Sequence, residues 1–346
     1  MKAGVYYSLA ASLLFAAGVP ASKVLLAHTT PMLFAGLCYF ASGAGVALLS
    51  LFSGGKHAEA PLCGRDWLWV CGSILAGGII APAILMTGIA LSPHASSASI
   101  LFTSEIVFTA ALARALFGEH VSAKVWLAAA LVTLGAAALS WKGGLAFGMD
   151  AGLWLVILAC LIWGFDNNFV SKVSGRNPTA LIVWKGLAAG AFNIALALWR
   201  GAQFPPATAF AGAMATGFVS YGLSLVFLIR AMRELGAARS AALFGTNPFV
   251  AATLSVVFLR EPLSPGLAAA FALNAAAAFL LFSENHLHEH VHESFTHNHL
   301  HSHDEHHAHG HSPSDPQGEP HSHPHEHSPL THNHPHSPDE HHRHGH

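Results

Sequence analysis

Several side chains that can carry charge or form strong hydrogen bonds lie inside long apolar stretches of the sequence. Glu105 stands within ILFTSEIVFTAAL, Asp166, Asn167 and Asn168 are consecutive, and Lys185 follows Pro178 by seven residues. An ionisable group deep in a membrane costs about 2.5–3.5 kcal/mol, so it normally faces a cavity or a partner. Glu105 is the best candidate for proton coupling or cation contact. Lys185 could pair with Glu105 or Asp166, or bind a carboxylate of the substrate. For all of these residues, hydrogen bonding between helices is the alternative role.

Three further amides, Asn193, Asn247 and Asn274, lie in later apolar stretches. Asn247 precedes Pro248, and a proline inside a helix frees a carbonyl and bends the helix. A bend beside an amide suits a binding site. For each Asn taken singly, packing between helices explains the residue about as well.

A second set of chemically active residues fills the C-terminal tail. Residues 284–346 hold 23 of the 27 histidines, mostly at alternate positions and mixed with Asp and Glu. Such side chains bind Zn, Ni, Co or Cu ions, although no spacing here fixes a tetrahedral site. Because Pro and Ser recur and hydrophobic residues are scarce, we expect a tail that is disordered without metal. The candidate ligands are His286, His288, His290, His292, His297, His299, His301, His303, His306, His307, His309 and His311.

The rest of the chain has the composition of a membrane protein. Over the whole sequence 53% of residues are apolar and 10% carry charge, against roughly 25% charged in a soluble domain. A spanning helix needs about 20 apolar residues. The sequence therefore predicts an all-α polytopic membrane protein with ten transmembrane helices, near residues 4–22, 31–52, 67–90, 95–117, 123–141, 151–171, 179–199, 208–230, 237–259 and 264–282.

The distribution of Lys and Arg predicts the orientation of these spans. With the N-terminus in the cytoplasm, ten basic residues fall on the inner side and four on the outer side. An even number of spans then places the C-terminal tail in the cytoplasm as well. The predicted location is the plasma (inner) membrane.

The two halves of the body repeat each other. Glu119 and Ser122 match Glu261 and Ser264 at an offset of 142, and Ser22-Lys23-Val24 matches Ser171-Lys172-Val173 at 149. Five spans per half is an odd number, so the halves cross the membrane in opposite senses. We expect two inverted five-helix repeats, residues 1–142 and 143–283, followed by the tail, residues 284–346. For the paired Lys and Glu residues near span ends, interfacial anchoring is the simpler role.

Two segments carry a resemblance to a known family. Phe15-Ala-Ala-Gly-Val-Pro-Ala-Ser-Lys23 and Trp163-Gly-Phe-Asp-Asn-Asn-Phe-Val-Ser-Lys172 resemble the first-helix motif of EamA-type carriers of the drug/metabolite transporter superfamily. Glu119 and Glu261 also resemble that family's pattern, and a related branch is similar in its histidine-rich tail. The first motif departs by Phe15-Ala16 in place of Trp-Gly. The resemblance implies a central cavity between the repeats, and leaves the solute open.

These observations favour a secondary transporter that moves a small polar organic solute, a metabolite or drug, by alternating access. A divalent transition-metal exporter and a non-transporting metal sensor or store are the alternatives. No nucleophile with a base, closed metal motif or phosphate loop is present, so an enzyme is disfavoured and no cofactor is required. The expected partners are the lipid bilayer, the solute and transition-metal ions, but no nucleic acid. A homodimer is one option for the oligomeric state.

Overall fold

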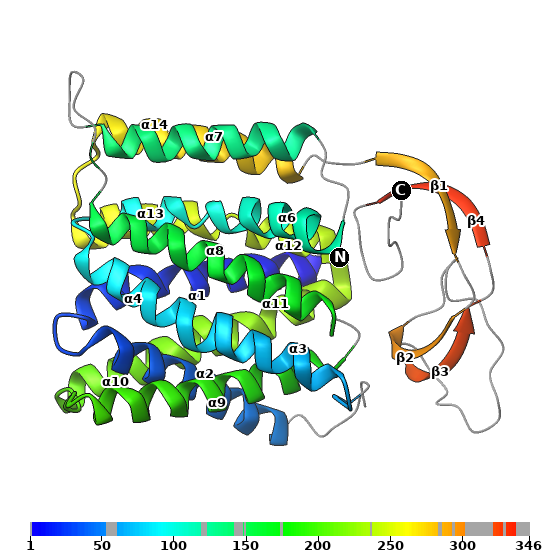
Figure 1. The fold of residues 1–346 in the computed structure, drawn as a ribbon, viewed down its shortest axis with the longest axis horizontal. Coiled ribbons are helices and arrows are strands. Elements are labelled where there is room, and N and C mark those ends of the chain that lie inside the picture. Colours follow the sequence, from blue (N-terminus) through cyan, green and yellow to red (C-terminus); the bar gives the residue numbers. More distant parts are fainter. Residues whose placement is uncertain are drawn as a thin grey trace.

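The computed structural model shows a bundle of helices that run roughly side by side (Figure 1). It describes residues 2–52, 61–118, 123–141, 148, 150–173, 176–235, 237–282, 286–292, 295–301, 321–327 and 330–336. Eight helical segments are long and apolar enough to cross a membrane, and two shorter apolar helices, Asn247–Leu259 and Pro265–Leu280, follow them. The helices of the body match the ten predicted spans, so the predicted all-α fold is confirmed.

Six of the ten spans are single uninterrupted helices. Each consists mostly of Leu, Ala, Val, Phe and Gly, residues that need no polar partner in lipid. The backbone groups inside each helix bond within it, except where Pro20 of α1 supplies no N–H group. They are α1 (Lys2–Leu25), α2 (Pro31–Phe52), α7 (Ala123–Ser140), α8 (Ala151–Ser171), α9 (Pro178–Trp199) and α14 (Pro265–Phe282).

The remaining four spans are interrupted, and the interruptions match between the halves. The third span is α3 (Asp66–Ser73), the π-helix η1 (Ile74–Ile80) and α4 (Ala81–Leu91); the eighth is α10 (Ala207–Thr216), the π-helix η2 (Gly217–Leu223) and α11 (Ser224–Leu235). The fourth is α5 (Ala95–Leu101) and α6 (Ser104–Phe117), and the ninth is α12 (Ala237–Phe244) and α13 (Asn247–Leu259). The second half thus repeats the irregular elements of the first.

The halves run in opposite directions. Lys23, at the end of α1, bonds to the end of α4, whereas Lys172, directly after the equivalent helix α8, lies over a ring at the end of α6. The two ends of the bundle are named here the Lys23 end and the Lys172 end. The main apolar core contains Phe34, Leu85 and Ile89, all fully or almost fully buried, and it draws on both halves.

The described part of the tail forms strands. β1 (His286–His292) pairs with β4 (Leu330–His336) and β2 (Phe295–His301) with β3 (His321–His327), both antiparallel. We expected disorder here; the alternation of His with other residues has the two-residue period of a strand, which accounts for the pairing. In β1, His286, His288 and His290 stand opposite His336, His334 and His332.

Candidate functional site

Asp166 lies in a buried polar network where the two halves meet. Its side chain is 6% exposed, and Oδ2 accepts a hydrogen bond from Lys185 Nζ at 2.5 Å. The other oxygen, Oδ1, accepts from Ser73 Oγ at 2.6 Å. Asp166 and Lys185 come from α8 and α9 of the second half, whereas Ser73 ends α3 of the first. The carboxylate is therefore held by partners from both repeats.

Glu105 extends the network along α6. Its Oε1 accepts a hydrogen bond from Nδ2 of Asn167 at 2.8 Å, and the same amide donates to Thr109 Oγ1 at 3.1 Å. Asp166 and Lys185 also interact electrostatically with Glu105, so the two contacts belong to one network. The structure thus brings together Glu105, Asp166, Asn167 and Lys185, four of the residues that the sequence singles out.

The network contains two carboxylates and one ammonium group. Lys185 balances the charge of Asp166, and the recorded hydrogen-bond partner of Glu105 is a neutral amide. A carboxylate without a cation of its own favours uptake of a proton or contact with a cationic group. The arrangement can therefore bind polar groups of either sign and exchange a proton.

The π-helix η1 supplies backbone acceptors beside these charges. Gly77 O accepts from Tyr39 OH at 2.7 Å and from Trp163 Nε1 at 3.2 Å. Asn193 Nδ2 donates to Gly78 O at 3.3 Å, on the same turn. The wider π-turn loosens the α-helical hydrogen-bond ladder, so carbonyls here are open to side-chain donors.

Glycine at position 77 is required by the position of Asp166. A Cβ added there would lie 1.9 Å from Asp166 Oδ2. The carboxylate therefore rests against the backbone of η1, in space that any other residue would fill.

Three other predicted amides lie apart from the Asp166–Lys185 pair. Asn168 Nδ2 donates to Thr109 O and Gly164 O, bonding α8 to α6. Asn247 opens α13 and bonds to Phe244 O at 2.9 Å, across the interruption of the ninth span. Asn274 bonds to Ala270 O within α14, and its amide fills the space beside Gly135 of α7.

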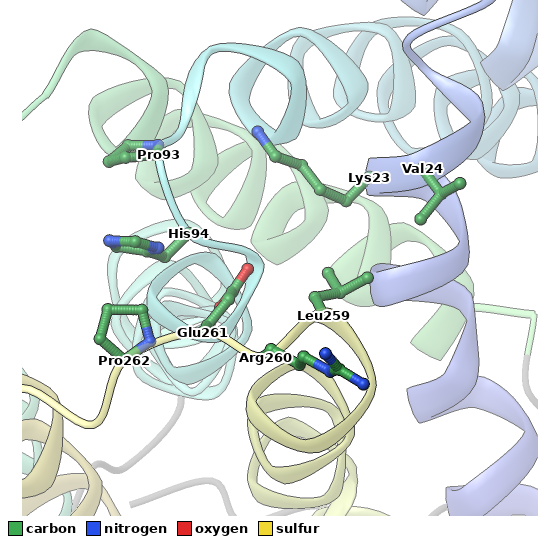
Figure 2. A pocket seen from close by; sticks show the side chains of 8 residues that line it. All are labelled: Lys23, Val24, Pro93, His94, Leu259, Arg260, Glu261 and Pro262. Atoms are coloured by element: carbon green, nitrogen blue, oxygen red, sulfur yellow. The ribbon is translucent and has the colours of Figure 1, made fainter.

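A shallow pocket opens at the Lys23 end of the bundle (Figure 2). It has a volume of about 340 Å³ and is lined by Lys23, Val24, Pro93, His94, Leu259, Arg260, Glu261 and Pro262. Lys23 and Glu261 both extend towards the connection between α4 and α5 (Figure 2). The sequence interpretation treats both residues as interfacial anchors; the structure gives them defined backbone partners.

Comparison with known proteins assigns the family. The EamA-like transporter family matches residues 2–141 and 150–283, which together hold the ten spans. The chain belongs to the EamA-like transporter family. It is thus a multi-pass membrane protein of a transporter family, as its first-helix motifs and its repeated halves predict.

Two similar proteins accompany this EamA-like assignment. An uncharacterized transporter of Methanothermobacter thermautotrophicus is 24% identical over 273 residues, which cover 74% of this chain and 79% of the relative. A solved structure, described as the crystal structure of a protein, is 17% identical with a TM-score of 0.60. It covers 80% of this chain and 95% of its own, and it supports the fold.

Sequence reasoning missed several residues of this EamA-like site. Ser73, Tyr39 and Trp163 contact the network or the η1 carbonyls, yet none is among the predicted site residues. In the sequence, Trp163 is notable only as the start of the second first-helix motif, because a hydroxyl or an indole in an apolar stretch does not stand out by type. The Gly77-Gly78 pair in the middle of a span is the signal that could have located the π-helix, since paired glycines in a helix allow close approach.

Twelve tail histidines are predicted as metal ligands. Seven of the twelve histidines proposed as ligands lie on strands β1 and β2, where the structure describes the backbone. His303, His306, His307, His309 and His311 lie outside the described residues.

Proposed function

We propose that this EamA-like transporter is a secondary carrier of the plasma (inner) membrane, with both termini in the cytoplasm. It moves a small polar organic solute by alternating access. The buried contacts of Asp166 with Lys185 and Ser73 carry the proposal, because they set charged groups between the two halves.

The inverted relation of the halves supports alternating access. In carriers built from inverted repeats, the substrate site lies near the midplane, at the interface of the repeats. The Asp166 network lies between the halves, which supports this role, since α3 and α6 come from one half and α8 and α9 from the other. Rocking one half against the other would expose the same groups to either side.

The chemistry of the network favours an organic solute over a transition metal. Two carboxylates, an ammonium group, two amides and backbone carbonyls can bind polar groups by hydrogen bonds. Among the described residues, no group of three or more His, Cys, Asp or Glu side chains is placed to hold a metal ion. Metal export remains the alternative.

Glu105 is the proposed coupling residue. Its partner Asn167 can rotate to donate to an ionised carboxylate or accept from a protonated one, so proton uptake needs no rearrangement of helices. A proton carried on Glu105 would then accompany or oppose the solute.

A transport assay tests the assignment. Membrane vesicles holding the full chain would be incubated with a panel of polar metabolites, and their contents measured by mass spectrometry. We expect at least one solute to accumulate, and Asp166→Asn to abolish most of its accumulation. Asp66→Asn is the matched control, because Asp66 is also ion-paired, with Arg176 at 2.8 Å, but at a helix end. Equal accumulation in both variants would contradict the proposal.

We also propose that the tail binds divalent transition-metal ions. The support is the alternation of histidine and the register that sets His opposite His in both strand pairs, for example His297 opposite His325. Equilibrium dialysis against Ni²⁺ and Zn²⁺ would compare the full chain with a chain ending at Ser283. Retention of metal by the full chain alone is expected, and equal retention by both would refute the idea.

A further inference from the structure

Lys23 is bonded to the end of the third span through backbone atoms. Its Nζ donates to Ile89 O at 2.9 Å, to Ala90 O at 3.2 Å and to Ser92 O. The last carbonyls of a helix lack partners within it, so an ammonium group there satisfies them and matches the helix dipole. α1 is thereby tied to the last turn of α4 and the residue after it.

Glu261 is bonded to the start of the fourth span in the complementary way. Its Oε1 and Oε2 accept from the backbone N–H groups of Ala95 and Ser96, at 2.7 and 2.9 Å. The preceding residue, Arg260, has φ of +53°, a conformation that side chains other than glycine rarely adopt. The connection between α13 and α14 is thus held in an unfavourable backbone conformation next to the contact.

The helix next to these two contacts, α5, is tightly packed. All seven residues of α5 are buried, whereas α6, the other part of the same span, buries Ser104 and Ala113. The fourth span is therefore more deeply buried towards the Lys23 end than towards the Lys172 end.

The repeat counterpart of Lys23 makes a different contact. Lys172 Nζ lies 3.7 Å from the centre of the Phe117 ring, at the end of the fourth span. α11 ends the eighth span, as α4 ends the third. If the halves were in equivalent states, Lys172 would bond to the last carbonyls of α11. Glu119, the counterpart of Glu261, lies outside the described residues. The recorded contacts of the two lysines thus differ between the ends, as expected for a carrier closed at one end.

We infer that Lys23 and Glu261 form a clamp that holds the Lys23 end shut, and that each transport cycle releases it. The clamp consists of Lys23, Glu261 and the backbone of residues 89–96. Both side chains are positioning residues: they act through the joint between α4 and α5 and leave solute contact to the Asp166 network. The inference rests on the proposed alternating access.

The test measures access to the closed end without any solute. Full-length chain in lipid nanodiscs, with the exposed Cys63 and Cys71 replaced by Ser, would carry Ser97→Cys on α5 as a reporter. Ser97 is 9% exposed. The rate of its reaction with a water-soluble maleimide would be compared with and without Glu261→Gln. The Gln amide carries no charge and places an NH₂ donor where one of the two carboxylate oxygens accepts, so it cannot reproduce both contacts.

We expect Glu261→Gln and Lys23→Gln each to raise the labelling rate by about tenfold, the effect of losing one charge-assisted hydrogen bond. Lys172→Gln is the matched control and should not raise it. A second reporter, Ser8→Cys, lies buried towards the opposite end and should label no faster. An unchanged rate at Ser97→Cys overturns the clamp, and so does a rise at both reporters, which indicates general loosening. Because labelling needs no solute, a failed transport assay with the expected labelling refutes the solute assignment alone.

Discussion

The ion pair between Lys185 and Asp166 places opposite charges inside two spans, where lipid offers neither a partner. Such a pair contributes little net stability, because desolvation offsets its attraction, but breaking it leaves a buried charge uncompensated. Each residue of the pair therefore needs the other to balance its charge. Replacing one residue should lower stability, and replacing both should restore much of that loss.

Lys185→Met should lower stability by about 3–5 kcal/mol, since the Asp166 carboxylate then lies buried without its cation. Adding Asp166→Asn should recover much of that loss. Thermal unfolding of the detergent-solubilised chain, followed by fluorescence, measures both. A double variant no more stable than the single one would show that the loss arises from packing.

Among the elements, the π-helix η1 lets the Asp166 carboxylate approach its backbone, and η2 is the matching π-helix of the second half. Both occupy the middle of the third helix of their half, and each contains glycine. In η1 the glycine at 77 admits Asp166 Oδ2, which a Cβ would approach to 1.9 Å. In η2, a Cβ at Gly222 would meet its nearest atoms, in Ser42 and Val46, at 3.3 Å.

Gly77→Ala should therefore impair both transport and stability, because the methyl group displaces Asp166 from Lys185 and Ser73. Gly222→Ala, the matched change in the other π-helix, requires shifts of a few tenths of an ångström and should have the smaller effect. Vesicle transport and melting temperature would be measured for both variants. Equal losses would mean that glycine is needed for the π-helix itself and not for Asp166.

At the scale of the whole molecule, large apolar side chains cover the outside of the bundle. Phe192, in the middle of α9, is 49% exposed, and Trp199, at its end, is 83% exposed. An amphipathic indole at a helix end suits the membrane–water interface, whereas the middle of a span faces hydrocarbon. The outside of the bundle is therefore suited to an apolar surrounding, such as lipid or detergent.

Phe192→Asp should reduce membrane insertion, since a charge at the centre of a spanning helix costs about 2.5–3.5 kcal/mol. Trp199→Asp, on the same helix, should have little effect because the interface is hydrated. The yield of folded chain in the membrane fraction measures both changes. A similar yield for the two variants would place the middle of α9 away from lipid.

Much of the fold could be predicted because each long apolar stretch of the sequence marks one membrane-spanning helix. Four predicted spans, 31–52, 95–117, 151–171 and 237–259, have the bounds of the observed helical segments, and the others differ by a few residues. The interruptions could not be predicted, since a π-turn leaves apolar composition unchanged. From the sequence alone, Lys185 could pair with several groups. Helix packing decides that its partner is Asp166, and packing cannot be inferred from the sequence.

The change in repeat offset, from 149 to about 142, also has a structural origin. The connection between α2 and α3 covers residues 53–65, and the equivalent connection between α9 and α10 covers residues 200–206. The second connection is six residues shorter, which accounts for most of the change. Insertions in such connections leave the spans intact, so the repeat survives in the helices while its register shifts.

The contacts of Lys23 and Glu261 have a consequence for how this chain can vary in evolution. Both side chains bind main-chain atoms of residues 89–96, which every amino acid other than proline supplies alike. Substitutions along that stretch should thus drift freely where packing allows. An inserted or deleted residue would move the amides and carbonyls out of reach of Lys23 and Glu261. Selection on residues 89–96 should therefore conserve the length of the segment more than its amino-acid identities.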